Sequence, residues 1–396
     1  MASASEDIYL DSCATSPPRS GVVEAMSEVQ TMAWGNPSSL HRQGLAAAEV
    51  LERCRWRIAS QLNSEIEDVV FTSGATESVH LALLGFAETL SPGRLVISAV
   101  EHPAVIAAAK GLERLGWDLA YWPVDRYGMI DMDQLDRMLA PPTRLVSLIW
   151  GQSEVGTLQP IETVGRACAE RGIPIHTDAT QVLSQGRPDW QSLPVDLLSA
   201  SAHKFGGPKG IGVLLARAQC RHRLRPRQGG GGQEHQLRAG TESVALLAGM
   251  ATAIEQLPPW LSPPAVRAET SCHQISDLRD QLLDALLEDP RLRLTGDRRR
   301  RLPHHISLLV FDHRERPLPG RAIVRALSQR GIAVSSGSAC SSGKDSGSSV
   351  LAAMGFGPDL QRAGLRLSLG SWIHQQHLPR ITSALIEALN EVSAQI

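Results

Sequence analysis

The feature that most constrains the fold of this chain is an alternation of short apolar runs with amphipathic stretches over its first 250 residues. Two of the amphipathic stretches, residues 76–90 and 103–115, have the pattern of helices. Short strands separated by helices indicate βαβ units and an α/β fold with a mostly parallel, doubly wound sheet. Open sheets of this kind bind ligands at the carboxyl ends of their strands, so we expect the site there. The predicted strands lie at residues 69–72, 94–98, 145–150, 173–178, 195–201 and 210–216.

A proline-rich segment at residues 257–264 is the expected boundary between two domains. Residues 17–256 are predicted to form the large α/β domain. Residues 1–16 and 257–396 are predicted to form a smaller α+β domain, which carries a loop rich in glycine and serine at residues 335–349. The further elements expected in the smaller domain are helices at 265–288, 321–330 and 378–396 and a strand at 305–311.

The composition excludes several classes of protein. Lys plus Arg total 39 against 41 Asp plus Glu, for a formal net charge of −2, so a protein built to hold nucleic acid or a membrane surface is not expected. The longest apolar stretch, residues 244–254, is far shorter than a spanning helix needs. The first residues lack the pattern of a signal peptide, and the six cysteines form no C-x-x-C pair. We therefore expect a cytoplasmic protein with neither a disulfide framework nor a metal site.

Three predicted strands end in residues whose chemistry has two interpretations. Small residues before Thr76 let backbone N–H groups approach an anion, or Thr76 simply caps the next helix. Asp178 ends a buried strand, where it either caps a helix or pairs with a cationic ligand atom such as a protonated pyridine nitrogen. Lys204 ends another strand, beside His203 and a glycine turn. Lysines are ordinarily solvated surface groups, but this setting fits an amine that forms a Schiff base with a phosphate-bearing aldehyde.

Three further residues outside these strand ends have candidate roles. His102 is either a turn residue before a proline-started helix or a ring that stacks on a planar cofactor and moves protons. Cys340 lies in a run dominated by serine and glycine, where an exposed thiol is suited to nucleophilic chemistry, whereas most free cysteines are small buried hydrophobes. Arg366 is a lone cation in an apolar strand, and its partner is a carboxylate of the protein or of the substrate. The basic runs at 221–227 and 298–301 are interpreted as solvated faces rather than docking patches.

Taken together, these motifs resemble the cysteine desulfurases, the NifS/IscS-like members of the class V, fold-type I enzymes that use pyridoxal phosphate. The resemblance implies a large domain with a seven-stranded, mostly parallel sheet and a smaller α+β domain. It extends nearly from end to end of the chain. The motifs that carry it lie at residues 9–11, 35–39, 71–78, 101–102, 178–181, 201–204, 238–241 and 335–341.

The resemblance also implies which residues hold the cofactor. Lys204 is implied to bind pyridoxal phosphate covalently, Asp178 to pair with the pyridinium nitrogen, and His102 to stack on the ring and transfer protons. Gln181 and Ser153 are implied to contact the phenolic oxygen of the ring, although Ser153 stands where the family usually has an asparagine. The phosphate is implied to be held by Ala75, Thr76, Ser201 and His203, with Thr241 from the other subunit of a homodimer.

The reaction implied is the conversion of L-cysteine to L-alanine, with the sulfur transferred to Cys340 as a persulfide. Arg366 and Asn36 are implied to bind the substrate. An iron–sulfur scaffold or a sulfur-carrier protein is implied as the acceptor, for the assembly of iron–sulfur clusters or thio-modified cofactors. The alternatives are a selenocysteine lyase or cystine C–S lyase of the same fold, and a non-catalytic homologue that binds partners. From its end at Ile396, the chain is expected to lack the extension with which some relatives grip their scaffold.

Overall fold

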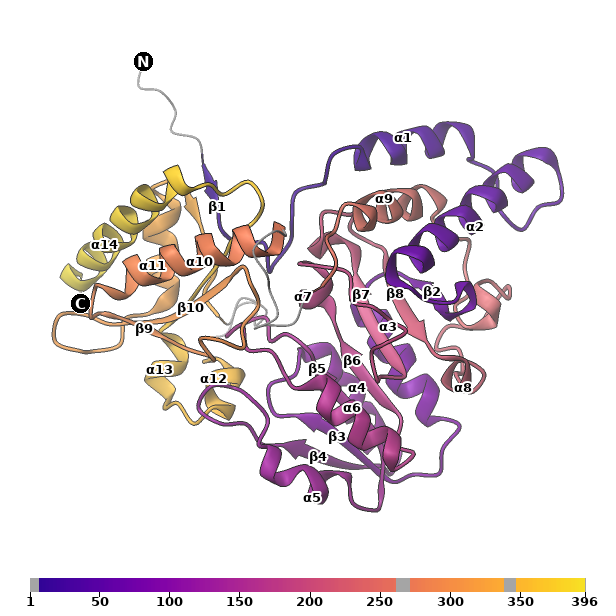
Figure 1. Ribbon diagram of the computed structural model, residues 1–396, viewed down its shortest axis with the longest axis horizontal. Coiled ribbons are helices and arrows are strands. Elements are labelled where there is room, and N and C mark those ends of the chain that lie inside the picture. Colours follow the sequence, from indigo (N-terminus) through magenta and orange to yellow (C-terminus); the bar gives the residue numbers. More distant parts are fainter. Residues whose placement is uncertain (1–6, 261–270, 338–346, 396) are drawn as a thin grey trace.

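The computed structural model describes residues 7–260, 271–337 and 347–395 (Figure 1). Cys340, the implied nucleophile, lies outside the described residues. The chain packs around two main groups of elements, one built on the large sheet and one built from the C-terminal part of the chain together with the N-terminal strand β1 (Ile8–Tyr9). The predicted domain boundary near residue 257 stays a prediction.

The large sheet has seven strands in the order β2-β8-β7-β6-β5-β3-β4. The pairs of β4, β3, β5, β6 and β7 are parallel, whereas β8 runs antiparallel to both β7 and β2. The expected doubly wound, mostly parallel sheet is therefore confirmed. The strands are β2 (Val69–Thr72), β3 (Arg94–Ser98), β4 (Asp118–Trp122), β5 (Thr143–Ile149), β6 (Ile175–Asp178), β7 (Leu197–Ser201) and β8 (Gly212–Ala216).

The strand β4 is the one member of the large sheet that the sequence analysis missed. It pairs only with β3, at the edge of the sheet, and four of its five residues are partly or fully exposed. Its sequence is apolar from Leu119 to Trp122, but an edge strand is covered on only part of its surface, so its side chains are less buried than those of the inner strands.

Helices cover both faces of the large sheet, which explains why its strands are apolar on both sides. On β2, Val69 and Phe71 join the core formed with α2 (Arg42–Leu62), α6 (Ile161–Glu170) and α9 (Val244–Glu255). Val70 between them joins a second core, formed with α3 (Ala75–His80) and α4 (Pro103–Glu113). Successive side chains of a strand point to opposite faces, so one strand supplies both cores. The helix expected at 76–90 is α3 followed by a wider turn at Leu81–Gly85.

The smaller part is an antiparallel three-stranded sheet of order β12-β10-β9, and its strands are β9 (Leu292–Leu294), β10 (His305–Val310) and β12 (Gly364–Ser368). The helices α10 (Ser271–Leu287), α11 (Gly320–Ser328) and α14 (Leu378–Ala394) pack on it around a core of leucine, isoleucine and valine. The strand β1 pairs in parallel with β11 (Ile332–Ala333), which ties the N-terminal segment to this part. The remaining helices are α1 (Val22–Met32), α5 (Leu135–Leu139), α7 (Thr180–Leu183), α8 (Ala218–Arg221), α12 (Ser349–Ala353) and α13 (Pro358–Arg362).

Among the described residues, no helix combines the length and the apolar character needed to cross a bilayer. The described part of the chain also contains no group of three or more His, Cys, Asp or Glu side chains placed to hold a metal ion.

Candidate active site

A cavity of about 980 Å³ lies at the carboxyl ends of the large sheet's strands, where ligands of open α/β sheets bind. Residues that follow β2, β3, β5, β6 and β7 form its walls, and Cys13–Thr15 and Arg366 close it from the smaller part. Ten residues singled out in the sequence therefore border one space. They are Ala75, Thr76, His102, Ser153, Asp178, Gln181, Ser201, His203, Lys204 and Arg366.

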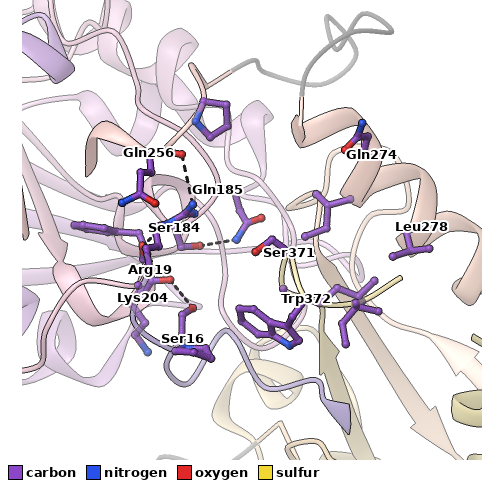
Figure 2. A pocket seen from close by; sticks show the side chains of 18 of the residues that line it. Ser16, Arg19, Ser184, Gln185, Lys204, Gln256, Gln274, Leu278, Ser371 and Trp372 are labelled. Carbon is purple, nitrogen blue, oxygen red and sulfur yellow. Dashed lines mark hydrogen bonds between the residues drawn. The ribbon is translucent and has the colours of Figure 1, made fainter. Parts of the chain in front are cut away.

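Lys204 ends the short helical turn that follows β7, and its amine reaches across the cavity to the N-terminal segment. Its Nζ donates hydrogen bonds to the carbonyl oxygens of Cys13, at 2.7 Å, and of Ala14, at 2.9 Å. The backbone of Lys204 is held from behind, where Ser16 Oγ donates to the Lys204 carbonyl at 2.9 Å (Figure 2). The backbone of Lys204 is thus fixed at the strand end, while the Lys204 amine borders the cavity.

Figure 2 views a second hollow, of about 690 Å³, on the other side of Lys204 between the two parts of the molecule. Ser16 and Arg19 line it on one side, and Leu278 and Trp372 line it on the other. Arg19 Nε donates to the Phe205 carbonyl at 2.8 Å, which braces the turn after Lys204.

Asp178 ends β6 and is buried in the cavity wall, with only 5% of its surface exposed. Its Oδ1 accepts a hydrogen bond from the Thr180 N–H at 3.0 Å. Within the part of the chain that the structure describes, no cationic side chain forms an ion pair with Asp178. Since an unpaired buried carboxylate is costly, the arrangement suits a cationic ligand atom better than a helix cap alone.

Gln181 stands one helical turn beyond Asp178 and connects the wall to the N-terminal segment. Its Nε2 donates to the Cys13 carbonyl at 3.0 Å, and its Oε1 is buried without a hydrogen-bond partner among the described residues. As placed, the free atom of the amide accepts hydrogen bonds. The contact with a phenolic oxygen that the resemblance implies would therefore need the amide to turn.

The wall after β2 is shaped by glycine. A Cβ atom on Gly212 would lie 2.6 Å from the Gly74 Cα, and Gly74 itself has a φ of +155°, so both positions need glycine. Thr76 and Ser201 border the space beside them. His203 is also there, and burial, with the charges of Lys204 and Lys209, lowers the pKa of His203 to about 4. The histidine is therefore neutral at pH 7 and approaches an anion as a hydrogen-bond donor rather than as a charge.

His102 has the first of the two roles considered for it, and its stacking role stays a prediction. It is the N-cap of α4, with Nδ1 accepting from the Ala104 N–H at 3.2 Å and Pro103 in the first turn. Its ring also borders the cavity, which is the position needed for a ring that stacks on a planar cofactor.

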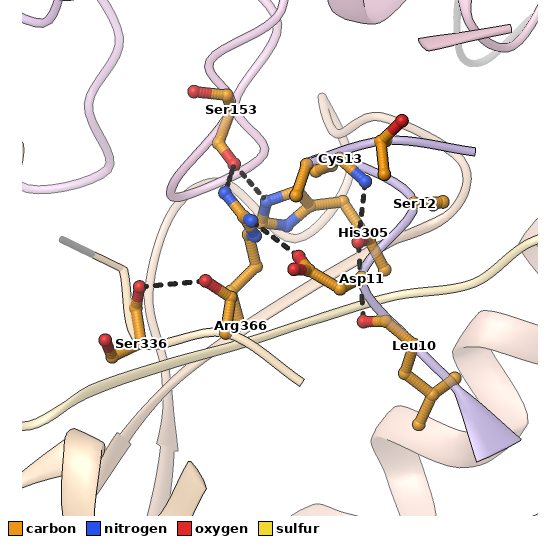
Figure 3. Close-up of polar contacts among 12 residues, drawn as sticks. Leu10, Asp11, Ser12, Cys13, Ser153, His305, Ser336 and Arg366 are labelled. Carbon is orange, nitrogen blue, oxygen red and sulfur yellow. Dashed lines mark hydrogen bonds and ion pairs between the residues drawn. The ribbon is translucent and has the colours of Figure 1, made fainter. Parts of the chain in front are cut away.

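Arg366 lies on β12 and reaches toward the turn after β5 (Figure 3). Its Nη2 pairs with Asp11 Oδ1 at 2.7 Å, and its Nη1 donates to the Ser153 carbonyl at 3.1 Å. His305 Nε2 lies 3.1 Å from that same carbonyl oxygen, and burial lowers the pKa of His305 well below its usual value, so the neutral ring is the donor. Arg366 Nε has no partner among the described residues and is buried.

The geometry assigns Ser153 a backbone contact in addition to the side-chain role that the resemblance implies. Ser153 borders the cavity, and its carbonyl oxygen joins Arg366 and His305, while its hydroxyl points away from Arg366 (Figure 3). The contact of the hydroxyl with the cofactor stays a prediction.

Two implied site residues do not border the cavity. Asn36 lies in the turn before α2, where its Oδ1 accepts from the Ser38 N–H at 2.9 Å, and Thr241 is exposed just before α9. Two residues of the site had no role assigned from sequence. Asp11 pairs with Arg366, and Glu101 is buried beside Asp178. Both residues belong to motifs that carry the resemblance to cysteine desulfurases, and this membership is the sequence signal that could have identified them as site residues.

Cys13 also borders the cavity, but its thiol is suited to packing rather than to attack. Its Sγ lies 3.2 Å from His304 Nε2, and burial raises the pKa of the Cys13 thiol. Burial lowers the pKa of His304 to about 3, so the imidazole is neutral and does not create a thiolate.

Comparison with known proteins decides the family. The sequence model described as Aminotransferase class-V matches residues 8–379. This chain belongs to the class-V aminotransferase family. Among class-V relatives, the cysteine desulfurase IscS of Methanosarcina thermophila is 35% identical over 97% of this chain and 92% of its own length. The cysteine desulfurase IscS of Vibrio vulnificus strain YJ016 is 37% identical over 94% of this chain and 90% of its own length.

Solved structures agree with this class-V assignment. A NifS-like protein superposes with a TM-score of 0.84 at 30% identity, covering 98% of this chain and 99% of that one. SspA in complex with cysteine superposes with a TM-score of 0.77 at 31% identity, covering 91% of this chain and 98% of that one. The resemblance to cysteine desulfurases and the predicted fold class are both confirmed.

Proposed function

We propose that this chain is a cysteine desulfurase that converts L-cysteine to L-alanine and transfers the sulfur to Cys340. The observation that carries the proposal is the meeting of Lys204, Asp178 and Arg366 at one cavity. An amine, a buried carboxylate without a cation, and a buried guanidinium are the groups that a phosphorylated pyridine aldehyde and an amino acid need. The class-V relatives named cysteine desulfurase support the same reaction.

The described residues fit pyridoxal phosphate as the cofactor. Asp178 has no cation partner among the described side chains, the Lys204 amine borders the same space, and the glycine positions 74 and 212 leave room beside Thr76 and Ser201. When bound, this cofactor withdraws electrons from the substrate Cα as its proton leaves. Lys204 would hold the aldehyde carbon, Asp178 the ring nitrogen, and His102 one face of the ring.

The chain's own residues would then handle the substrate as follows. Arg366 binds the carboxylate of cysteine, and the Lys204 amine accepts the Cα proton. The Cys340 thiolate attacks the substrate sulfur, so that an S–S bond forms as the C–S bond breaks. The carbon left behind takes up a proton to give alanine, and Cys340 keeps the sulfur as a persulfide. The acceptor we propose is an iron–sulfur scaffold or sulfur-carrier protein, in the reducing cytoplasm.

The test is the release of alanine and sulfide from L-cysteine with a reductant present, in the parent and in Cys340→Ser. Equimolar release that collapses in the variant is the expected result. Equal activity in both proteins would contradict the proposal and favour a C–S lyase. Cys54→Ser is a matched control, because that thiol is buried in the core and does not border the cavity.

We propose further that the working unit is a homodimer. Three large apolar side chains from the end of α1 to the start of α2 are exposed, Met32 at 74%, Trp34 at 66% and Leu40 at 90%. Asn36 lies among them, and such a patch fits a second copy of the chain better than water. Thr241 would then reach the phosphate of the partner's site. Trp34→Asp combined with Leu40→Asp should shift the mass measured by light scattering from dimer to monomer. An unchanged dimer would place the interface elsewhere.

A further inference from the structure

Glu101 joins the carboxyl ends of two neighbouring strands through one of its oxygens. It lies three residues after β3 and is 3% exposed. Its Oε1 accepts hydrogen bonds from the Ser98 N–H at 3.3 Å, from Ser98 Oγ at 2.8 Å and from the Ile149 N–H at 2.8 Å. Since Ser98 ends β3 and Ile149 ends β5, this oxygen links the two strands where their own pairing stops.

The second oxygen of Glu101 has a different environment. Oε2 is buried, and among the residues that the structure describes it has no hydrogen-bond partner. Glu101 also has no ion pair with any described cation, although it borders the cavity. Burying an ionised carboxylate is energetically costly when one of its oxygens has no hydrogen-bond partner. A protonated carboxyl group places only a neutral hydroxyl at that position.

A second carboxylate lies on the next strand. Ile149, whose N–H holds Glu101, is the register partner of Asp178 in the parallel pair of β5 and β6. Adjacent strands are about 4.8 Å apart, so the two acids share one end of the sheet. Burial, together with the charge of Asp178, raises the pKa of Glu101 to about 8, although the three donors act in the opposite direction. Two carboxylates in such proximity do not readily both ionise.

We infer that Glu101 is a proton-holding positioning residue, whose Oε2 carries a hydrogen so that Asp178 alone presents a negative charge at this wall of the cavity. Among the described residues, the groups that hydrogen-bond Glu101 are uncharged, namely Ser98 from β3 and Ile149 from β5, while His102 follows Glu101 in the chain just before α4. The inference rests on the proposed role of Asp178 toward a pyridine nitrogen.

The test is an infrared pH titration of the cofactor-loaded protein, which follows the C=O stretching band of protonated carboxyl groups between pH 6 and 10. The parent should lose one such band with a midpoint near pH 8, the value expected for Glu101. Glu101→Gln should lack that transition from the start, because the amide keeps an acceptor oxygen for the three donors and cannot titrate. A parent spectrum without the transition, or a transition that persists in Glu101→Gln, would overturn the inference.

Glu154 provides the matched control, because it is another buried carboxyl group at this cavity and, like Glu101, has one oxygen without a described partner. Burial raises its pKa as well, and its Oε1 has no partner among the described residues. Glu154→Gln should leave the Glu101 transition in place; its disappearance in that variant would assign the band to Glu154 and overturn the inference.

Asp178→Asn keeps the inference testable if Glu101→Gln does not fold. Removing the neighbouring charge should move the midpoint to lower pH, since that charge favours the protonated form. An unchanged midpoint would contradict the inference that Glu101 and Asp178 interact at the same wall of the cavity. The infrared band does not depend on turnover, so failure of alanine release would count against the proposed function without deciding the state of Glu101.

Discussion

The two walls of the cavity bury their charges to the same extent but balance them differently. Asp178 is 5% exposed and Arg366 is 6% exposed. Arg366 is already paired, with Asp11 at 2.7 Å and the Ser153 carbonyl at 3.1 Å. Asp178 has a single backbone N–H as its donor and no ion pair with any side chain in the described ranges. Because a buried charge needs a partner, the Asp178 wall depends on a ligand while the Arg366 wall is largely complete without one.

Under the proposed function, the Asp178 wall would bind the cofactor and the Arg366 wall would bind the substrate. The Asp178 wall is formed by strand ends of one sheet, so its groups are placed before any ligand arrives. The Arg366 wall joins β12, the N-terminal segment and the turn after β5 (Figure 3). Changes in the first wall should therefore act on the cofactor and the rate, and changes in the second on substrate affinity. Five substitutions test this division, and they are described from the largest expected effect to the smallest.

Lys204→Ala should lower the rate of alanine formation by about 1,000-fold, since the variant loses the amine that holds the aldehyde and moves the Cα proton. The visible absorbance of the bound cofactor should change in the same variant. Lys209→Ala is the control, because Lys209 borders the same cavity but is exposed. Equal losses in the two variants would show that charge near the cavity matters, and not the position of Lys204.

Asp178→Asn should lower kcat by about 100-fold with little change in KM, because it removes a fixed charge from the site without changing its shape. Steady-state kinetics with L-cysteine measure both constants. Asp196→Asn serves as the comparison, since Asp196 Oδ2 holds the Ile175 N–H at the opposite end of the same strand. A rise in KM alone would assign Asp178 to the substrate and break the division between the walls.

Arg366→Lys should raise KM for L-cysteine by about 10- to 100-fold, because a lysine keeps the charge but loses the fork that binds a carboxylate. The kcat at saturating substrate should fall much less. Arg293→Lys on β9, at the other edge of the same three-stranded sheet, is the control, as that side chain is about half exposed and pairs with Glu315. A variant with normal KM would place the substrate carboxylate elsewhere.

Asp11→Asn should raise KM by about threefold, since the amide keeps an acceptor oxygen for Arg366 but removes the charge that orients it. The same kinetic assay gives the value. If KM falls instead, Asp11 competes with the substrate carboxylate for Arg366, and the pair is a barrier to binding rather than a support.

Ser153→Ala should change kcat and KM by less than about twofold, because the contacts seen for Ser153 use its backbone carbonyl, which the substitution keeps. Ser153→Asn, which restores the residue usual in the family, is the paired variant. A tenfold loss in Ser153→Ala would show instead that the hydroxyl contacts the cofactor.

The strand ends could be predicted from the sequence because they depend on local patterns. Asp178 and Lys204 each follow an apolar run, and parallel strands bring such positions to one edge of the sheet. The edge strand β4 was not predicted, although Leu119 to Trp122 are apolar, and it is the least buried strand of the large sheet. Asn36 and Thr241, which the resemblance places in the site, do not border the cavity of one chain, and the proposed homodimer would be needed to bring them there.

The sequence by itself thus determined the layered α/β fold, the edge of the sheet where the site lies, and the lysine and aspartate that characterise it. Only the tertiary structure decided how the buried charges are balanced. Asp11 and Arg366 are 355 residues apart in the chain, and Glu101 meets Ile149 across 48 residues. Hydrophobic pattern is a local property of the chain, whereas the partner of a buried charge depends on which distant segments packing brings within hydrogen-bonding distance.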